Sequence, residues 1–242
     1  MFQRIFLSAI LAGLLSGLIV TALHHVTTTP LIIEAEKYES GTPKAEQKTS
    51  FSQSNSHPYL ILAHGNAHKE GESSSEWSPA DGIERTVYTG LTTILTAIGF
   101  ALLLTSAYAL SNQSVDGRTG VMWGMAGFAA IALAPSLGLP PELPGSAAAD
   151  LVSRQIWWLI TAVATSIAIA LLVFANNWVL RAIGVILIMA PHAIGAPHPE
   201  GYASSVPAEI QGHFVTASLA CNFILWSLLG WFSGTFYKKF SA

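Results

Sequence analysis

Long apolar stretches alternate with polar ones along this chain, and the apolar stretches have the length of membrane-spanning helices. A run of about 18 or more apolar residues is typical of a transmembrane helix. Lipid offers no hydrogen-bond partner to open backbone groups, so each such run must be helical. We predict apolar helices at Ile5–Val26, Tyr88–Leu110, Gly120–Leu139, Ile156–Ala175, Trp178–Gly195 and His213–Phe236. The predicted fold class is an all-α, polytopic transmembrane helical bundle of about six spans.

Basic residues in the short connections set the predicted orientation. If the N-terminus is cytoplasmic, Arg154 is the one basic residue in a short outer connection. The basic residues that then fall inside are Arg4, Arg118, Arg181, Lys238 and Lys239. Short cytoplasmic connections carry such an excess of Lys and Arg, so both termini are predicted inside. The fifth segment is the weakest, because it is short and Pro191 interrupts it.

The same pattern divides the chain into a first helix, a polar outer loop and a five-helix region, at residues 1–26, 27–87 and 88–242. Two parts of the loop, Ser40–Ser56 and Lys69–Pro79, are rich in Ser, Glu, Lys, Gly and Thr. That composition cannot bury enough apolar surface to fold alone, so we expect partial disorder. The apolar segment Pro58–Ala63 is the exception and could rest on the membrane surface or on the helices.

Composition agrees with a membrane protein. Charged residues make up 10% of the 242 residues and the mean hydropathy is +0.49, whereas soluble domains carry about 25% charged residues. The single cysteine, Cys221, gives neither a disulfide framework nor a thiolate metal site. A cleaved signal peptide ending near Ala22 is the alternative for the first segment, but its apolar run of about 22 residues exceeds a typical signal core.

Histidines and acids concentrate on the predicted outer side. Of 14 acidic residues, Asp116 alone falls inside. All eight histidines fall outside: His24, His25, His57, His64, His68, His192, His198 and His213. Imidazole with carboxylate suits divalent transition metals such as cobalt, nickel or zinc. The outer side is therefore a candidate metal-binding face, although polar residues also populate outer loops for solubility and no tight ligand spacing such as HExxH is present.

His192 is the most informative histidine. It lies in LIMAPHAIGAP, between Pro191 and Pro197, at membrane depth or close to it. Ionisable residues at that depth are costly and indicate function, and the alternative is a histidine that simply reaches the membrane interface. The segments Leu133–Gly145 and Met189–Gly201 also align at a constant offset of 56 residues. Transporters often place such proline-broken helices in corresponding halves around the site, but two similar proline-terminated helix ends give the same pattern.

Four blocks of the chain resemble the CbtA family, the larger membrane subunit of a predicted bacterial cobalt transporter. They are HHVTTTPLIIEAEKYE (His24–Glu39), WGMAGFAAIALAPSLGLPPELPG (Trp123–Gly145), RQIWW (Arg154–Trp158) and APHAIGAP (Ala190–Pro197). The resemblance implies cobalt uptake across the bacterial inner membrane in support of cobalamin synthesis, with cobalt as transported substrate and no organic cofactor. It also implies a small one-span partner, CbtB, that bears its own histidines. The matching metal-ligand candidates are His24, His25, Glu34, Glu36, Glu142, His192 and His198.

Two other functions remain open on the sequence. A membrane cytochrome would use paired histidines as haem ligands, with His24 or His25 facing His192, and would show a Soret band. A non-transporting metal-binding or assembly factor would give no metal flux into liposomes. The sequence contains no phosphate loop, catalytic triad or dinucleotide motif, so we predict neither ATP hydrolysis nor another enzyme activity.

Overall fold

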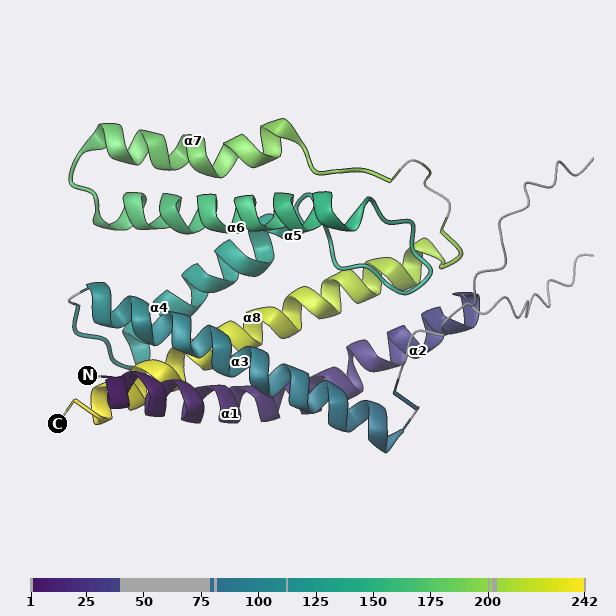
Figure 1. Cartoon of the computed structure of the whole chain (residues 1–242), viewed down its shortest axis with the longest axis horizontal. Helices are drawn as coiled ribbons and strands as arrows, with labels where there is room; N and C mark the ends of the chain where they lie inside the picture. The colour runs from purple at the N-terminus through teal and green to yellow at the C-terminus, as the bar shows by residue number, and fades with distance from the viewer. Residues whose placement is uncertain are drawn as a thin grey trace, which may run out of the picture.

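A computed structural model shows a helical molecule and describes residues 2–39, 79–80, 82–111, 113–199, 201 and 204–241. No strand occurs among those residues. The elements, labelled in Figure 1, are α1 (Phe2–Val26), α2 (Thr28–Glu39), α3 (Ile83–Ser111), α4 (Gly117–Phe128), the π-helical turn η1 (Ala129–Leu133), α5 (Ala134–Ser136), α6 (Leu151–Phe174), α7 (Trp178–Ile194) and α8 (Ala208–Lys239). The predicted all-α membrane bundle is confirmed.

The number of membrane crossings follows from helix length and from where the chain ends meet. Within the described part of the chain, α1, α3, the continuous stretch Gly117–Ser136, α6 and α8 are long and apolar enough to span a membrane, whereas α7 has 17 residues. The Nε–H of Arg4 donates to the carbonyl of Tyr237 over 2.6 Å, so α1 begins beside the end of α8. Termini on one side require an even number of crossings. Counting the short apolar helix α7, which is at the lower limit for a span, gives six crossings, in agreement with the prediction of about six spans.

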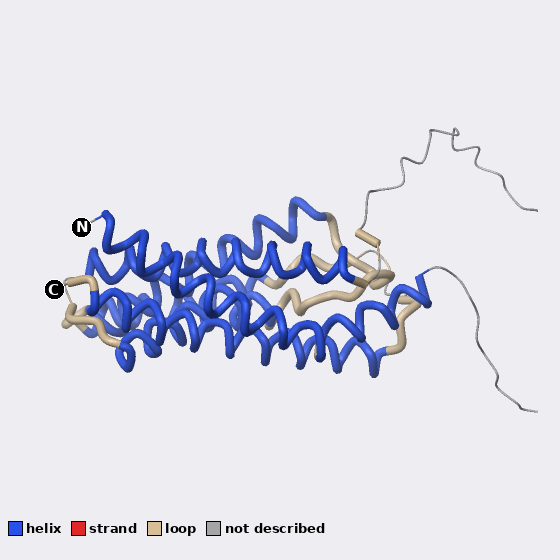
Figure 2. Tube along the Cα trace, turned by 90° about the horizontal axis from the view of Figure 1, so that it is seen from below, coloured by secondary structure: helices blue, strands red, loops and turns tan. Residues whose placement is uncertain are grey.

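We call the end that holds both termini the inner end and the opposite one the outer end, following the orientation predicted from the basic residues. Figure 2 shows the helices running along the long axis of the molecule, with both termini at one end. An aspartate caps the inner start of α4: the Asp116 carboxylate accepts hydrogen bonds from the backbone N–H groups of Arg118 and Thr119. Asp150 caps the outer start of α6 in the same way, accepting from the N–H of Ser153.

Two pairs of helices approach closely through glycine. On α4, a Cβ at Gly120 would collide with the carbonyl oxygen of Gly230 in α8, and a Cβ at Gly124 would collide with that of Trp226. On α1, a Cβ at Gly13 would lie 2.5 Å from the Cα of Ile98 in α3. Small residues permit such backbone approach between membrane helices. We call these contacts, α4 with α8 and α1 with α3, the glycine seams.

The hairpin of α6 and α7 is attached differently. Among the described helices, α7 packs against α6 and no other, and α6 meets the rest of the bundle mainly at η1 and α5 (Figure 1). The turn η1 immediately precedes α5, whose second residue is Pro135. Proline lacks the N–H that an α-helix needs, and π-helical turns often accommodate such a break.

The structure differs from the prediction just after the first helix. The polar loop was predicted to begin at residue 27, but Thr28–Glu39 forms α2, and α3 begins at Ile83, five residues before the predicted start at Tyr88. An apolar face holds α2 against the outer end of the bundle, in a cluster made of Leu31, Ile32, Ala35, Leu143, Val206, Ile210 and Phe214. At 12 residues, α2 is too short for a span, so hydropathy did not reveal it. Pro58–Ala63, His57, His64 and His68 lie outside the described residues.

Candidate metal site

The first candidate ligands lie where α1 passes into α2. His24 and His25 occupy the last turn of α1 and, as neighbours on a helix, point about 100° apart. His24 is half-buried, with Nδ1 2.8 Å from Oγ1 of Thr28, and its Nε2 has no hydrogen-bond partner among the described residues. His25 is exposed and borders a hollow of about 10 Å³ between α1 and α3. That volume has room for a single water.

The two candidate carboxylates of α2 are in different states. The carboxylate of Glu36 accepts two hydrogen bonds from Arg85 in the first turn of α3, from Nη1 to Oε1 over 2.7 Å and from Nη2 to Oε2 over 3.1 Å. Such a two-point guanidinium–carboxylate pair is strong and largely neutralises the acid. Glu34 is exposed, and no described side chain hydrogen-bonds to it. Of the two acids, Glu34 is the one open to an incoming cation.

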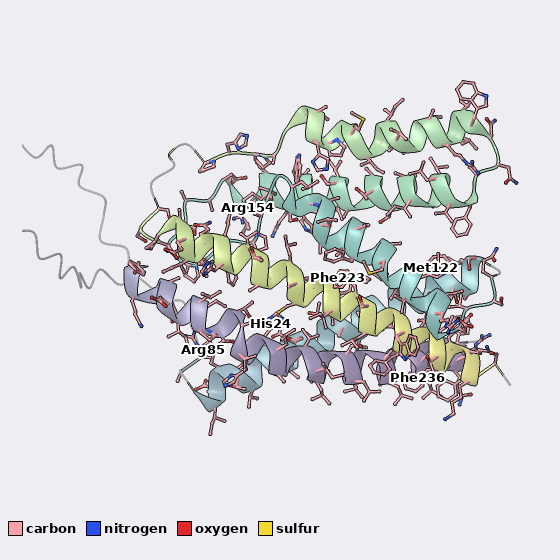
Figure 3. All side chains as sticks on the ribbon, turned by 180° about the vertical axis from the view of Figure 1, so that it is seen from behind. His24, Arg85, Met122, Arg154, Phe223 and Phe236 are labelled. Carbon is pink, nitrogen blue, oxygen red and sulfur yellow. The ribbon has the colours of Figure 1, made fainter. Side chains whose placement is uncertain are left out.

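A second pair of candidates belongs to the outer connections of the other helices. Glu142, between α5 and α6, accepts a hydrogen bond over 2.6 Å from Nη2 of Arg154 in the first turn of α6. His198 follows α7 and is exposed. Figure 3 shows Arg85 and Arg154 toward the same end of the molecule, on different helices. Two of the predicted carboxylate ligands, Glu36 and Glu142, are thus each paired with an arginine.

His192 lies in the last turn of α7 and packs against α6. Its ring is 5.8 Å from that of Trp157, at an interplanar angle of 69°. The indole Nε1–H of Trp157 donates to the carbonyl of Pro191 over 3.3 Å. Because Pro191 has no N–H, the carbonyl of Leu187, one turn earlier, lacks its usual helical donor. The imidazole of His192 and the indole of Trp157 therefore meet near the outer end of α7, and the Leu187 carbonyl lies more than one turn before His192.

The candidates form two groups. His24, His25, Glu34 and Glu36 come from α1 and α2, and Glu142 is next to Leu143, which packs in one cluster with Ala35 of α2. His192 and His198 come from α7 and the connection that follows it. The helices α1 and α7 do not pack against each other (Figure 1). In the part of the chain that the structure describes, no three His, Cys, Asp or Glu side chains are gathered closely enough to hold a metal ion. A shared ligand set stays a prediction.

Sequence reasoning assigned no role to Arg85, Arg154 or Trp157, although each contacts a candidate or its neighbour. One signal was present: Arg154 stands out as the single basic residue in a short outer connection. An arginine retained on the outer side against the positive-inside tendency is a reason to look for a carboxylate partner. The position of Trp157 on the buried face of α6 depends on packing and gave no such signal.

One comparison with known proteins is informative. A family model described as a probable cobalt transporter subunit (CbtA) matches residues 2–238, nearly the whole chain. The match runs from the start of α1 to the last turn of α8. No curated protein and no solved structure matches the chain.

Proposed function

Because the chain belongs to the CbtA family of probable cobalt transporter subunits, we propose that it carries cobalt ions inward after capturing them at its outer end with histidines and carboxylates. The observation that carries this proposal is the position of the described histidines. They lie at outer helix ends or in outer connections: His24, His25, His192, His198 and His213. Family membership agrees with the predicted resemblance and favours transport over the haem-binding and assembly alternatives.

Imidazoles are the first contacts in this proposal. Neutral imidazole nitrogen is a good ligand for divalent transition metals. His24 offers Nε2, because its Nδ1 is engaged by Thr28. His192 packs against Trp157, which limits the orientations of its ring. A histidine whose orientation is held by a neighbour binds metal better than a freely rotating one.

The arginine pairs give the carboxylates a second role. Arg85 and Arg154 form ion pairs with the carboxylates of Glu36 and Glu142, to which a metal dication would bind. A dication has to displace a guanidinium to reach either oxygen of Glu36 or Oε2 of Glu142. We propose that the ion is first captured by histidine together with Glu34, and that the arginine pairs open as it moves on. The pairs thereby keep the two carboxylates from remaining bare when no metal is present.

The family description names a subunit, which implies a complex. We propose that the partner is a small one-span membrane protein of the CbtB type with its own histidines, and that the complex lies in the bacterial inner membrane. A partner ligand would complete a site that the described residues do not close by themselves. The imported cobalt would serve cobalamin synthesis.

Uptake of radioactive cobalt by cells tests the proposal. His192→Asn keeps a polar group at the same depth but removes a good ligand, so uptake should fall at least about tenfold at unchanged protein level. His213→Asn is the control, because His213 lies near another outer helix end, is exposed where His192 is half-buried, and is not a proposed ligand; its uptake should be normal. Normal uptake by His192→Asn would exclude ligation by His192.

Reconstitution separates transport from binding. Liposomes that contain the chain with its partner should accumulate cobalt, and liposomes with the partner alone should not. The same preparation, measured by absorption spectroscopy, should lack a Soret band. Binding without accumulation would favour the assembly-factor alternative over the proposal.

A further inference from the structure

A polar hollow of about 370 Å³ lies at the inner end of the bundle, away from all candidate metal ligands. It is bounded by the start of α1, the end of α3, the connection to α4 and the end of α8. The residues that matter for its chemistry are Arg4, Gln113, Ser114, Asp116, Tyr237 and Lys238. Phe236, labelled in Figure 3, marks this end of α8.

Arg4 is held in place at the edge of this hollow. Its Nε–H donates to the carbonyl of Tyr237 over 2.6 Å, and its guanidinium carbon lies 3.5 Å from the centre of the Tyr237 ring. Nη1 and Nη2 donate to no described residue. A planar guanidinium fixed in this way presents two N–H groups in the spacing that matches two oxygens of a phosphate. Little conformational freedom remains to be lost on binding.

The charges of the hollow favour an anion. Lys238 Nζ lies 3.8 Å from Oδ2 of Asp116, so these two charges largely offset each other. The other oxygen of Asp116, Oδ1, is turned toward the start of α4, where it accepts backbone hydrogen bonds. The charge of Arg4 is therefore the unbalanced one in the lining. Gln113 and Ser114 are exposed there and add uncharged hydrogen-bond donors.

We propose that this hollow binds a phosphate group at the inner membrane surface. The group can be carried by the headgroup of an anionic phospholipid or by a soluble phosphate, and the recognition chemistry is the same. Basic pockets between transmembrane helices on the cytoplasmic side are known to take anionic headgroups. A phosphate bound to Arg4, whose guanidinium rests on Tyr237, would strengthen the contact between the first turn of α1 and the last turn of α8. The site is independent of cobalt capture, so either proposal can fail alone.

Thermal unfolding of the full chain in neutral detergent tests this site. Phosphatidylglycerol, phosphatidylcholine and inorganic phosphate are titrated separately, and native mass spectrometry counts the bound lipid. Phosphatidylglycerol or inorganic phosphate should raise the melting temperature, and Arg4→Gln should weaken that response about fivefold to tenfold. Arg181→Gln is the matched control. Arg181 is also a basic residue of the inner face with its Nε on a backbone carbonyl, that of Ala175 at 2.9 Å, but it does not line the hollow.

A second variant keeps the test sharp if Arg4→Gln loosens the fold. Ser114→Trp fills the hollow without removing the contact between Arg4 and Tyr237, so binding should be lost while the melting temperature of the unliganded protein is kept. Protection by phosphatidylglycerol alone identifies a lipid headgroup, and equal protection by inorganic phosphate identifies a soluble source. The proposal is overturned if no phosphate protects, if phosphatidylcholine acts as well as phosphatidylglycerol, or if Arg181→Gln weakens the response as much as Arg4→Gln.

Discussion

The glycine seams and the α6–α7 hairpin are two solutions to packing in the same bundle. In the seams, glycines bring backbones so close that a Cβ would overlap the facing chain. The hairpin instead has α7 in contact with α6 alone among the described helices, and is joined to the bundle near a π-helical turn and Pro135. Of the two proposed ligands of greatest interest, His24 lies on a seam helix and His192 on the hairpin.

This contrast indicates which part of the molecule can move. Helices whose backbones are in close contact have few alternative arrangements. A hairpin joined to the bundle mainly at η1 and α5 can shift as a unit about that junction. A shift of the hairpin would change the distance between His192 and His24 without disturbing either seam. The predictions that follow probe the two regions, starting with the largest expected effect.

The seams should not tolerate a side chain. Gly124→Leu places a Cβ against the carbonyl oxygen of Trp226, so we expect about 3 kcal/mol of destabilisation or failure to fold. Gly99→Leu on α3 is the matched control, since a Cβ there would meet no described atom of another helix within 4 Å. Fluorescence-detected size exclusion after heating measures both. Equal melting temperatures for the two variants would show that the backbones of α4 and α8 leave room for a side chain at Gly124.

The indole of Trp157 should hold the outer end of α7 against α6. Trp157→Phe keeps an aromatic side chain but removes the hydrogen bond to the Pro191 carbonyl and part of the packing of a buried indole, a loss of about 1–3 kcal/mol. Amide hydrogen exchange should quicken in α7 while α1 and α3 keep their rates. The neighbouring Trp158 is 37% exposed and its indole hydrogen-bonds to no described residue, so Trp158→Phe is the control. Faster exchange throughout the bundle would contradict a separately attached hairpin.

The ion pair at the base of the hairpin should matter next. Arg154→Gln leaves Glu142 unpaired in a partly buried place, and we expect a cost of about 1–2 kcal/mol, less than for a fully buried pair because the side chains are 27% and 22% exposed. The double variant Glu142→Gln/Arg154→Gln should recover most of the loss. Melting curves of the single and double variants give the coupling. If the double variant lost as much stability as Arg154→Gln and Glu142→Gln together, the two side chains would not be coupled.

The smallest effect concerns the cap of α4 at the inner end of a seam helix. The backbone N–H of Thr119, followed by its hydroxyl, donates to the Asp116 carboxylate and holds the pKa of Asp116 below 3.8. A lowered pKa means that this contribution to stability is complete above pH 3.8 and is lost as the pH falls through the folded-state value. Asp116→Asn keeps a capping oxygen but should flatten the dependence of the melting temperature on acid pH. If Asp116→Asn kept the full dependence of the melting temperature on acid pH, another titratable group would be its cause.

Hydropathy and charge were enough to predict most of the fold. Each predicted apolar segment corresponds to a helix, because a span in lipid has to be long, apolar and internally hydrogen-bonded. The helix α2 was not predicted, because its stability depends on contacts of Leu31, Ile32 and Ala35 with α8 and two distant loops. A pattern within 12 residues carries no information about those loops. The same limitation applies to the glycines, whose partners on other helices could not be identified from the sequence.

By itself, the sequence determined the helical membrane class and the concentration of imidazoles and carboxylates toward one end of the chain's helices. These properties depend on the residues along each segment and on their order. Tertiary structure alone decided that Arg85 pairs with Glu36, that Arg154 pairs with Glu142, and that His24 and His192 lie on helices that do not touch. Those facts depend on which helices become neighbours. Close packing between segments that are far apart in the chain decides which helices become neighbours. The hydropathy of one segment does not contain that information.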